Sequence, residues 1–311
     1  MEQVDSIEAL MDPGEATDFF EVADLEPFNP GARTSYDRDN VLWLMEFSRL
    51  IYRQESDEKE RPPDYPTRNQ FLNGHGWNED EFFNVKSTQA GWFRNPTMKC
   101  AAFVFRGTLG LADTVTDLEF PLVDWDGAGR VHVGFKRALE DVWDQLKPRI
   151  TASQVPVFFT GHSLGAALAT LAAAKSLQDP DIKGAQPAAV YTYGSPRVGN
   201  ADFVKSFGNL FHCRVVNEED VVSTVPPAIL GGLTPYAHAG RMHRIEHDGR
   251  LHIYPPGADT PEPPRSLPEA LGFLVSMNAT FKRVKNGEIE IPEFLRDHTP
   301  VNYTARLEKA G

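Results

Sequence analysis

A chain of 311 residues with 41% apolar side chains can bury the core of one large α/β domain or of two small ones. Its formal net charge is −13, and nine of its acidic residues lie in residues 1–32, which contain no Lys or Arg. This acidity and the lack of a basic patch argue against a nucleic-acid partner. The two cysteines lie far apart, which argues against a disulfide framework, and neither has the spacing of a metal ligand.

The acidic N-terminus is interpreted as a solvated extension. We assign residues 1–33 to this extension and residues 34–311 to a single domain; an interaction tail or an inhibitory flap is the alternative role of the extension. No basic stretch followed by an apolar run opens the chain, so no signal peptide is predicted. The longest apolar run, residues 164–174, is too short to cross a bilayer. A cytoplasmic location is therefore the default expectation, with secretion after removal of a leader as the alternative.

The first predicted elements are one helix and three strands. Residues 41–52 carry apolar side chains at helical spacing, and residues 37–40 offer N-caps, so an amphipathic helix is expected. After a charged, Pro-rich loop, short β-rich runs predict strands at residues 82–85, 87–93 and 100–105.

Strands and helices alternate through the rest of the chain. Runs rich in β-branched and aromatic residues occur at 155–159, 188–193 and 211–216, and helical patterns occur before residue 146, at 166–174, at 202–207, near 268–285 and at 292–303. This alternation predicts a largely parallel sheet with helices on both faces. Asp248 and Gly249 separate two alternating runs, which predicts a hairpin.

The motif Gly-His-Ser-Leu-Gly at residues 161–165 lies between the apolar run 155–159 and the small-residue helix 166–174. Strand, tight turn and helix in this order are the context of a nucleophile elbow. Glycines two residues before and after Ser163 let strand and helix approach closely, because they have no Cβ. The sequence therefore predicts that Ser163 is a nucleophile.

A nucleophilic serine needs a histidine base and a carboxylate that orients the base. In folds with this elbow the chain order is serine, acid, histidine. Asp220 follows the strand 211–216 and is the favoured acid, whereas Asp179 and Asp181 lie in a helix-to-strand loop on the other edge of the sheet. The histidines downstream of the serine are His212, His238, His243, His247, His252 and His298. His298 lies in a loop between two helical patterns, but spacing alone does not choose it.

Five motifs over about 120 residues are similar to those of the class 3 lipases, the fungal-type triacylglycerol lipase family of the α/β-hydrolase fold. They are Phe-Arg-Gly-Thr at 105–108, Val-His-Val-Gly-Phe at 131–135, Gly-His-Ser-Leu-Gly at 161–165, Thr-Tyr-Gly-Ser-Pro-Arg-Val-Gly at 192–199, and Asn-Glu-Glu-Asp-Val-Val at 217–222 followed by Pro226 and Pro227. The resemblance implies a mostly parallel central sheet with helices on both faces, a nucleophile elbow and a short lid.

The resemblance also implies roles for individual residues. It makes Ser163 the nucleophile, Asp220 the acid and His298 the base, and it assigns the oxyanion hole to Thr108 and to the backbone N–H of Leu164. The lid position is occupied by Leu109, Leu111, Ala112 and Val115.

Two positions depart from the pattern of the family. Thr114 replaces the Trp of better-known fungal members, which argues against strong interfacial activation. Ser223 replaces the usual proline after the acid.

The expected activity is that of a serine carboxylester hydrolase, a triacylglycerol lipase or esterase that forms an acyl-enzyme and needs no cofactor or metal. Its expected partner is a lipid or another small ester, taken up in some cases at an oil–water interface. The alternatives are a feruloyl esterase, phospholipase or galactolipase of the same fold, or a non-catalytic lipase-like scaffold.

Two sequence features compete with this interpretation. Residues 243–247 spell the zinc-peptidase pattern His-x-x-Glu-His, but the run leads directly into Asp248 and Gly249, so a hairpin is favoured over a metal-binding helix. His238 matches a structural His-x-Gly of the family and is the alternative base.

Overall fold

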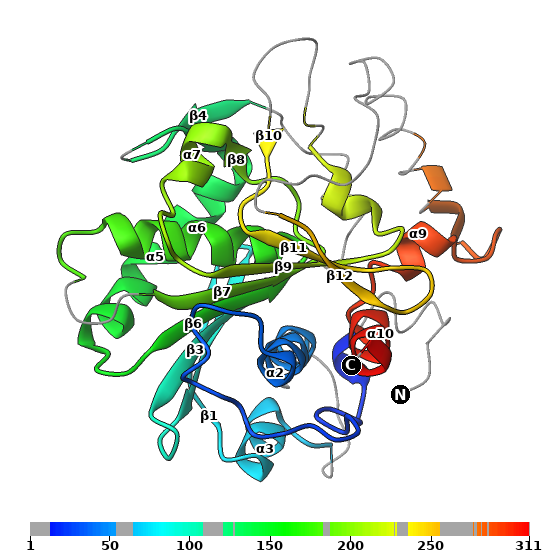
Figure 1. The fold of residues 1–311 in the computed structure, drawn as a ribbon, viewed down its shortest axis with the longest axis horizontal. Coiled ribbons are helices and arrows are strands. Elements are labelled where there is room, and N and C mark those ends of the chain that lie inside the picture. The colour runs from blue at the N-terminus through cyan, green and yellow to red at the C-terminus, as the bar shows by residue number, and fades with distance from the viewer. Residues whose placement is uncertain are drawn as a thin grey trace.

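The computed structural model describes residues 13–53, 65–107, 121–126, 128–182, 187–226, 236–255 and 286–310, together with 228, 276, 279–280 and 282–284. An eight-stranded sheet with the order β1-β2-β3-β6-β7-β9-β11-β12 forms the centre of the molecule (Figure 1). Its strands are β1 (Asn78–Val85), β2 (Thr88–Asn95), β3 (Cys100–Phe105), β6 (Val157–His162), β7 (Pro187–Tyr193), β9 (His212–Asn217), β11 (Arg241–Ile245) and β12 (Leu251–Ile253).

The structure confirms the predicted, largely parallel strand pairing and the predicted hairpin. The five strands β3, β6, β7, β9 and β11 pair in parallel, and the strands at both edges pair antiparallel. The β11–β12 hairpin encloses Asp248 and Gly249, as the turn signal predicted. Because the central strands are parallel, their carboxyl ends meet at one edge of the sheet, where loops from several strands can form a common site.

Helices cover both faces of the sheet (Figure 1). They are α2 (Arg38–Leu50), α3 (Arg68–Gly74), α5 (Val133–Ala152), α6 (Leu164–Gln178), α7 (Ala201–Lys205), α9 (Glu293–Arg296) and α10 (Pro300–Ala310), with short 3₁₀ turns η1 (Pro13–Glu15) and η2 (Val221–Thr224). Successive side chains of β3 point to opposite faces. Phe103 packs in the core beneath α5 and α6, while Val104 packs in the core beneath α2 and α10. Among the described helices, none is long and apolar enough to cross a bilayer.

The helix predicted over 41–52 begins slightly earlier, at Arg38. The side chain of Asp37 accepts a hydrogen bond from the backbone N–H of Asn40 at 3.0 Å and caps the helix. The helix expected near 268–285 falls mostly outside the described residues.

A second, antiparallel sheet was not predicted. It has the order β10-β8-β5-β4, from β10 (Tyr236–Ala237), β8 (Gly199–Asn200), β5 (Arg130–His132) and β4 (Leu122–Asp124). Strands of two or three residues are too short to show an alternating pattern, so only tertiary pairing reveals them.

The interpretation of the N-terminal segment as solvated is wrong for the stretch from Phe19 to Phe28. The side chains of Phe19, Phe20, Val22 and Phe28 are buried and pack in the core around α2. Acidic residues lie between these apolar side chains. The segment can therefore bury its apolar side chains and expose its acidic ones, and its net charge does not reveal this. Residues 1–12 lie outside the described part, and the domain division after residue 33 stays a prediction.

Candidate active site

Ser163 forms a sharp turn between β6 and α6. Its φ of 59° and ψ of −126° lie in a region that non-glycine residues rarely adopt, at a cost of roughly 1–3 kcal/mol. A methyl group on Gly161 would overlap the backbone of Gly165, and one on Gly165 would overlap the carbonyl of Phe105. The helix therefore lies as close to β6 and to the neighbouring β3 as the two glycines permit, and the predicted strand–turn–helix elbow is present.

Asp220 and His298 lie 78 residues apart in the chain and are hydrogen bonded in the fold. Nδ1 of His298 lies 2.8 Å from Oδ1 and 2.9 Å from Oδ2 of Asp220. A carboxylate accepts hydrogen bonds, so Nδ1 carries the hydrogen and Nε2 of the neutral ring presents a lone pair. Nε2 is buried and has no hydrogen-bond partner among the described residues. The ring is therefore held from one side and can accept a proton on the other.

His162, the neighbour of Ser163 in the elbow, connects the elbow to His298. Its Nε2 donates to the backbone carbonyl of His298 at 2.6 Å, and the two imidazole rings lie 4.5 Å apart between centroids. Its Nδ1 then accepts from the hydroxyl of Tyr52 at 3.1 Å. Burial and the neighbouring His298 hold the pKa of His162 well below its ordinary value, so this ring is neutral. His162 thus fixes the loop that carries His298 beside the elbow.

The carboxylate of Asp220 accepts two further hydrogen bonds. The hydroxyl of Tyr303 donates to Oδ2 at 2.6 Å, and the backbone N–H of Val222 donates to Oδ1 at 2.9 Å. A Cβ on Gly194, whose φ is +57°, would lie 2.9 Å from Nδ1 of His298, so only glycine fits beside the pair. Tyr303 is the contact that sequence reasoning missed as part of the site. Its signal was its position in the helix that follows His298.

Of the other six predicted site residues, only Leu164 lies in the part of the chain that the structure describes. Leu164 is the first residue of α6, so its N–H has no carbonyl partner within the helix and lies at the positive end of the helix dipole. Thr108 and the predicted lid residues Leu109, Leu111, Ala112 and Val115 lie outside the described residues. Their roles stay predictions.

His238 is not brought to the acid. Its Nε2 donates to the backbone carbonyl of Ser223 at 2.7 Å. Burial, together with Arg214 and Arg197, holds the pKa of His238 well below its ordinary value. A histidine in this setting is a neutral structural donor.

The two competing signals from the sequence also have structural explanations. His243 lies on strand β11, so the His-x-x-Glu-His run is part of a hairpin and not of a metal-binding helix. Within the described ranges, no group of three or more His, Cys, Asp and Glu side chains could hold a metal ion. Asp179 and Asp181 each lie 2.8 Å from Nζ of Lys147, after the C-terminus of α6, whereas the elbow lies at the N-terminus of that helix.

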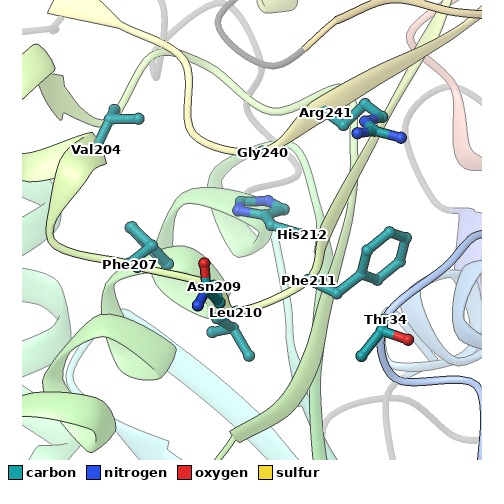
Figure 2. Close-up of a pocket in the computed structure, with 10 residues that line it drawn as sticks. Thr34, Val204, Phe207, Asn209, Leu210, Phe211, His212, Gly240 and Arg241 are labelled. Atoms are coloured by element: carbon teal, nitrogen blue, oxygen red, sulfur yellow. The ribbon is translucent and has the colours of Figure 1, made fainter.

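A cavity of about 390 Å³ lies near the amino ends of β9 and β11, at the opposite edge of the sheet from Asp220. Figure 2 shows His212 among the side chains that line it, with Phe207, Leu210 and Arg241. Nε2 of His212 lies 3.1 Å from Oγ1 of Thr192. The cavity does not include the elbow or the Asp220–His298 pair.

The elbow after a central parallel strand, the acid after a later strand and the histidine near the C-terminus define an α/β-hydrolase fold. Residues 102–230 match the family model of the class 3 lipases. This part of the chain is similar to the class 3 lipases.

Known proteins of the family are similar over part of the chain. A lipase of Rhizopus niveus is 36% identical over 165 residues, which are 50% of this chain and 42% of that protein. A lipase of Rhizomucor miehei is 33% identical over 171 residues, 52% of this chain and 46% of that protein. The structure of the Rhizomucor miehei triacylglyceride lipase has a TM-score of 0.53 at 25% identity and covers 63% of this chain and 80% of that one. The chain thus matches less than half of the length of these curated relatives.

Proposed function

We propose that the protein is a serine carboxylester hydrolase of the triacylglycerol lipase type. The observation that carries this proposal is the hydrogen bond from His298 to Asp220, which leaves Nε2 free to accept a proton beside the Ser163 elbow. A serine, a histidine and a carboxylate in this chain order, with the carboxylate hydrogen bonded to the histidine, are the machinery of acyl transfer.

The proposed reaction has two half-reactions. Nε2 of His298 takes the proton of the Ser163 hydroxyl while Oγ attacks the ester carbonyl carbon, and Asp220 stabilises the imidazolium that forms. The N–H of Leu164, with Thr108, binds the oxyanion. The imidazolium returns the proton to the departing alcohol and leaves an acyl-enzyme. Water then attacks this ester by the same proton transfers and releases the acid.

The substrate class we propose is a lipid ester. A secreted mono- and diacylglycerol lipase of Fusarium solani is 38% identical over 137 residues. A phospholipase A1 of Oryza sativa is 36% identical over 124 residues, so a phospholipid is the second candidate substrate.

The test is hydrolysis of p-nitrophenyl esters from acetate to palmitate, of emulsified triglyceride and of phospholipid vesicles by wild type and Ser163→Ala. We expect turnover by wild type and none above background by the variant, and covalent labelling of wild type alone by a fluorophosphonate. The position of the maximum along the ester series separates an esterase from a lipase. A wild type that is folded, unlabelled and inactive on every ester would leave the scaffold interpretation standing.

A further inference from the structure

The C-terminal helix α10 contacts both loops that carry the acid and the histidine. Tyr303 and Arg306 are three residues apart and so lie on the same face of the helix. Tyr303 donates to Asp220 as described above. Arg306 makes two ion pairs with residues close to the proposed catalytic ones: Nη1 with Glu218, and Nη2 with Oδ1 of Asp297 at 2.9 Å.

These ion pairs are largely withdrawn from solvent. The side chains of Arg306, Glu218 and Asp297 are 14%, 7% and 0% exposed. An exposed ion pair contributes little, but breaking a buried one leaves an uncompensated charge and is costly. Glu218 precedes Asp220 by two residues and Asp297 precedes His298 directly, so a single guanidinium links the two loops.

Hydrogen bonds of Asp297 also connect the two loops. Oδ2 of Asp297 accepts the backbone N–H of Glu219 at 3.0 Å, and the side-chain amide of Asn217 donates to the carbonyl of Asp297 at 2.9 Å. The loop before Asp220 is therefore attached to the loop before His298 through both side chain and backbone of Asp297.

Glu218, the residue of the acid loop that Arg306 binds, has a strained backbone. Glu218 has a φ of +23°, a conformation that is strained for a non-glycine residue and persists only when its surroundings hold it. Its N–H donates to the carbonyl of Ile245 at 3.0 Å, and its carbonyl accepts from Arg244 at 3.2 Å. The backbone of Glu218 is thus bound to β11 and its carboxylate to α10. These contacts fix the direction of the chain from Glu218 to Asp220.

We propose that Arg306 is a positioning residue that holds the Asp220 loop and the His298 loop at the mutual distance that acyl transfer requires. This inference rests on the proposed function. The guanidinium is suited to the task because its rigid fork can bind two carboxylates at once, whereas the single ammonium of lysine cannot hold both in the same geometry.

The test measures kcat and KM on one soluble ester for wild type, Arg306→Met and Arg306→Lys, with active serines counted by fluorophosphonate titration. For Arg306→Met we expect kcat per active serine to fall about 10- to 100-fold with KM little changed, because a misplaced base affects chemistry more than binding. Arg306→Lys should recover part of the loss. The matched control is Arg250→Met, which removes an exposed guanidinium paired with Asp248 in the β11–β12 turn and should leave kcat unchanged.

A lower melting temperature with wild-type kcat per active serine in Arg306→Met would overturn the proposal and assign Arg306 a purely structural role. Should Arg306→Met fail to fold, Arg306→Lys and Glu218→Gln carry the test, and unchanged kcat in both would have the same meaning. Failure of the proposed function is recognised separately, because wild type itself would then neither label nor turn over.

Discussion

Two regions of the molecule hold buried histidines, and their charged neighbours differ in sign. His298 lies against the carboxylate of Asp220, with both acceptor oxygens within 2.9 Å of Nδ1. His238 and His212 lie instead near the guanidinium of Arg214, and burial together with this cation lowers the pKa of both rings, that of His212 to about 3.

The comparison shows that burial beside a cation leaves a histidine as a neutral hydrogen-bonding group. A proton acceptor in catalysis also needs a partner that stabilises the cation formed during the reaction. Only the first region supplies such a partner, although all three histidines lie downstream of the serine and satisfy the expected chain order.

The largest effect on kcat should come from replacing His298, in contrast to replacing the alternative base His238. In His298→Ala the serine has no proton acceptor, and we expect kcat to fall by about 10⁴-fold or more. His238→Gln, which can still donate to the carbonyl of Ser223, should change kcat less than about tenfold. Initial rates on p-nitrophenyl butyrate, normalised to folded protein, check both. Activity that survived in His298→Ala and disappeared in His238→Gln would reverse the assignment.

The next effect concerns the carboxylate itself. Asp220→Asn keeps the shape of the side chain, but its amide cannot stabilise an imidazolium and can present a donor to Nδ1, which favours the wrong tautomer. We expect a decrease in kcat of about 10⁴-fold. Asp181→Asn, at an exposed ion pair with Lys147, is the control and should retain full activity. Equal rates for the two variants would remove Asp220 from the mechanism.

His212, in the second region, should affect how the free energy of unfolding depends on pH. The folded pKa of His212 is about 3, below the ordinary value of 6.5, so between these values the unfolded chain binds more protons and the free energy of unfolding falls as pH falls. Each pH unit corresponds to about 1.4 kcal/mol for one such residue. His212→Gln should therefore show a shallower decrease from pH 6.5 to pH 4.5 in urea titrations. Parallel slopes in the two proteins would show that His212 protonates in the folded state.

Asp297 acts in the opposite direction over part of this range. Burial raises its pKa to about 6, so the folded chain keeps a proton that the unfolded chain loses, and this residue's contribution to stability falls as pH rises from about 4 to about 6. The comparison of His212→Gln with wild type is unaffected, because Asp297 is present in both.

The smallest effect on kcat should come from removing the Tyr303 hydroxyl that donates a hydrogen bond to Asp220. Tyr303→Phe removes the donor to Asp220 and leaves the backbone N–H of Asn217, which donates to the same hydroxyl at 3.0 Å, without its partner. We expect a loss of about 1–3 kcal/mol in the free energy of unfolding and a several-fold decrease in kcat. Urea denaturation and initial rates measure the two. Tyr254→Phe, at a partly exposed hydroxyl paired with Glu246, is the control. An equal loss in both variants would mean that the Tyr303 hydroxyl has no special role.

The sequence by itself determined the local features of this protein. The order of strands and helices, the elbow around Ser163 and the hairpin at Asp248 follow from periodicity, glycine spacing and turn chemistry, which act over a few residues. The choice of Asp220 as the favoured acid also followed from its place after a strand. Several histidines and the short strands of the second sheet remained undecided, because no local pattern distinguishes them.

Tertiary structure decided what depends on distant contacts. It brought His298 to Asp220 across 78 residues and brought His238 to the carbonyl of Ser223. It buried Phe19 and its neighbours against α2 despite the acidic composition of their segment. It also placed Tyr303 and Arg306 of the last helix on the loops of the site. The physical reason is that hydrogen bonding and desolvation depend on which groups meet in space, and this is set by the packing of the helices on the sheet.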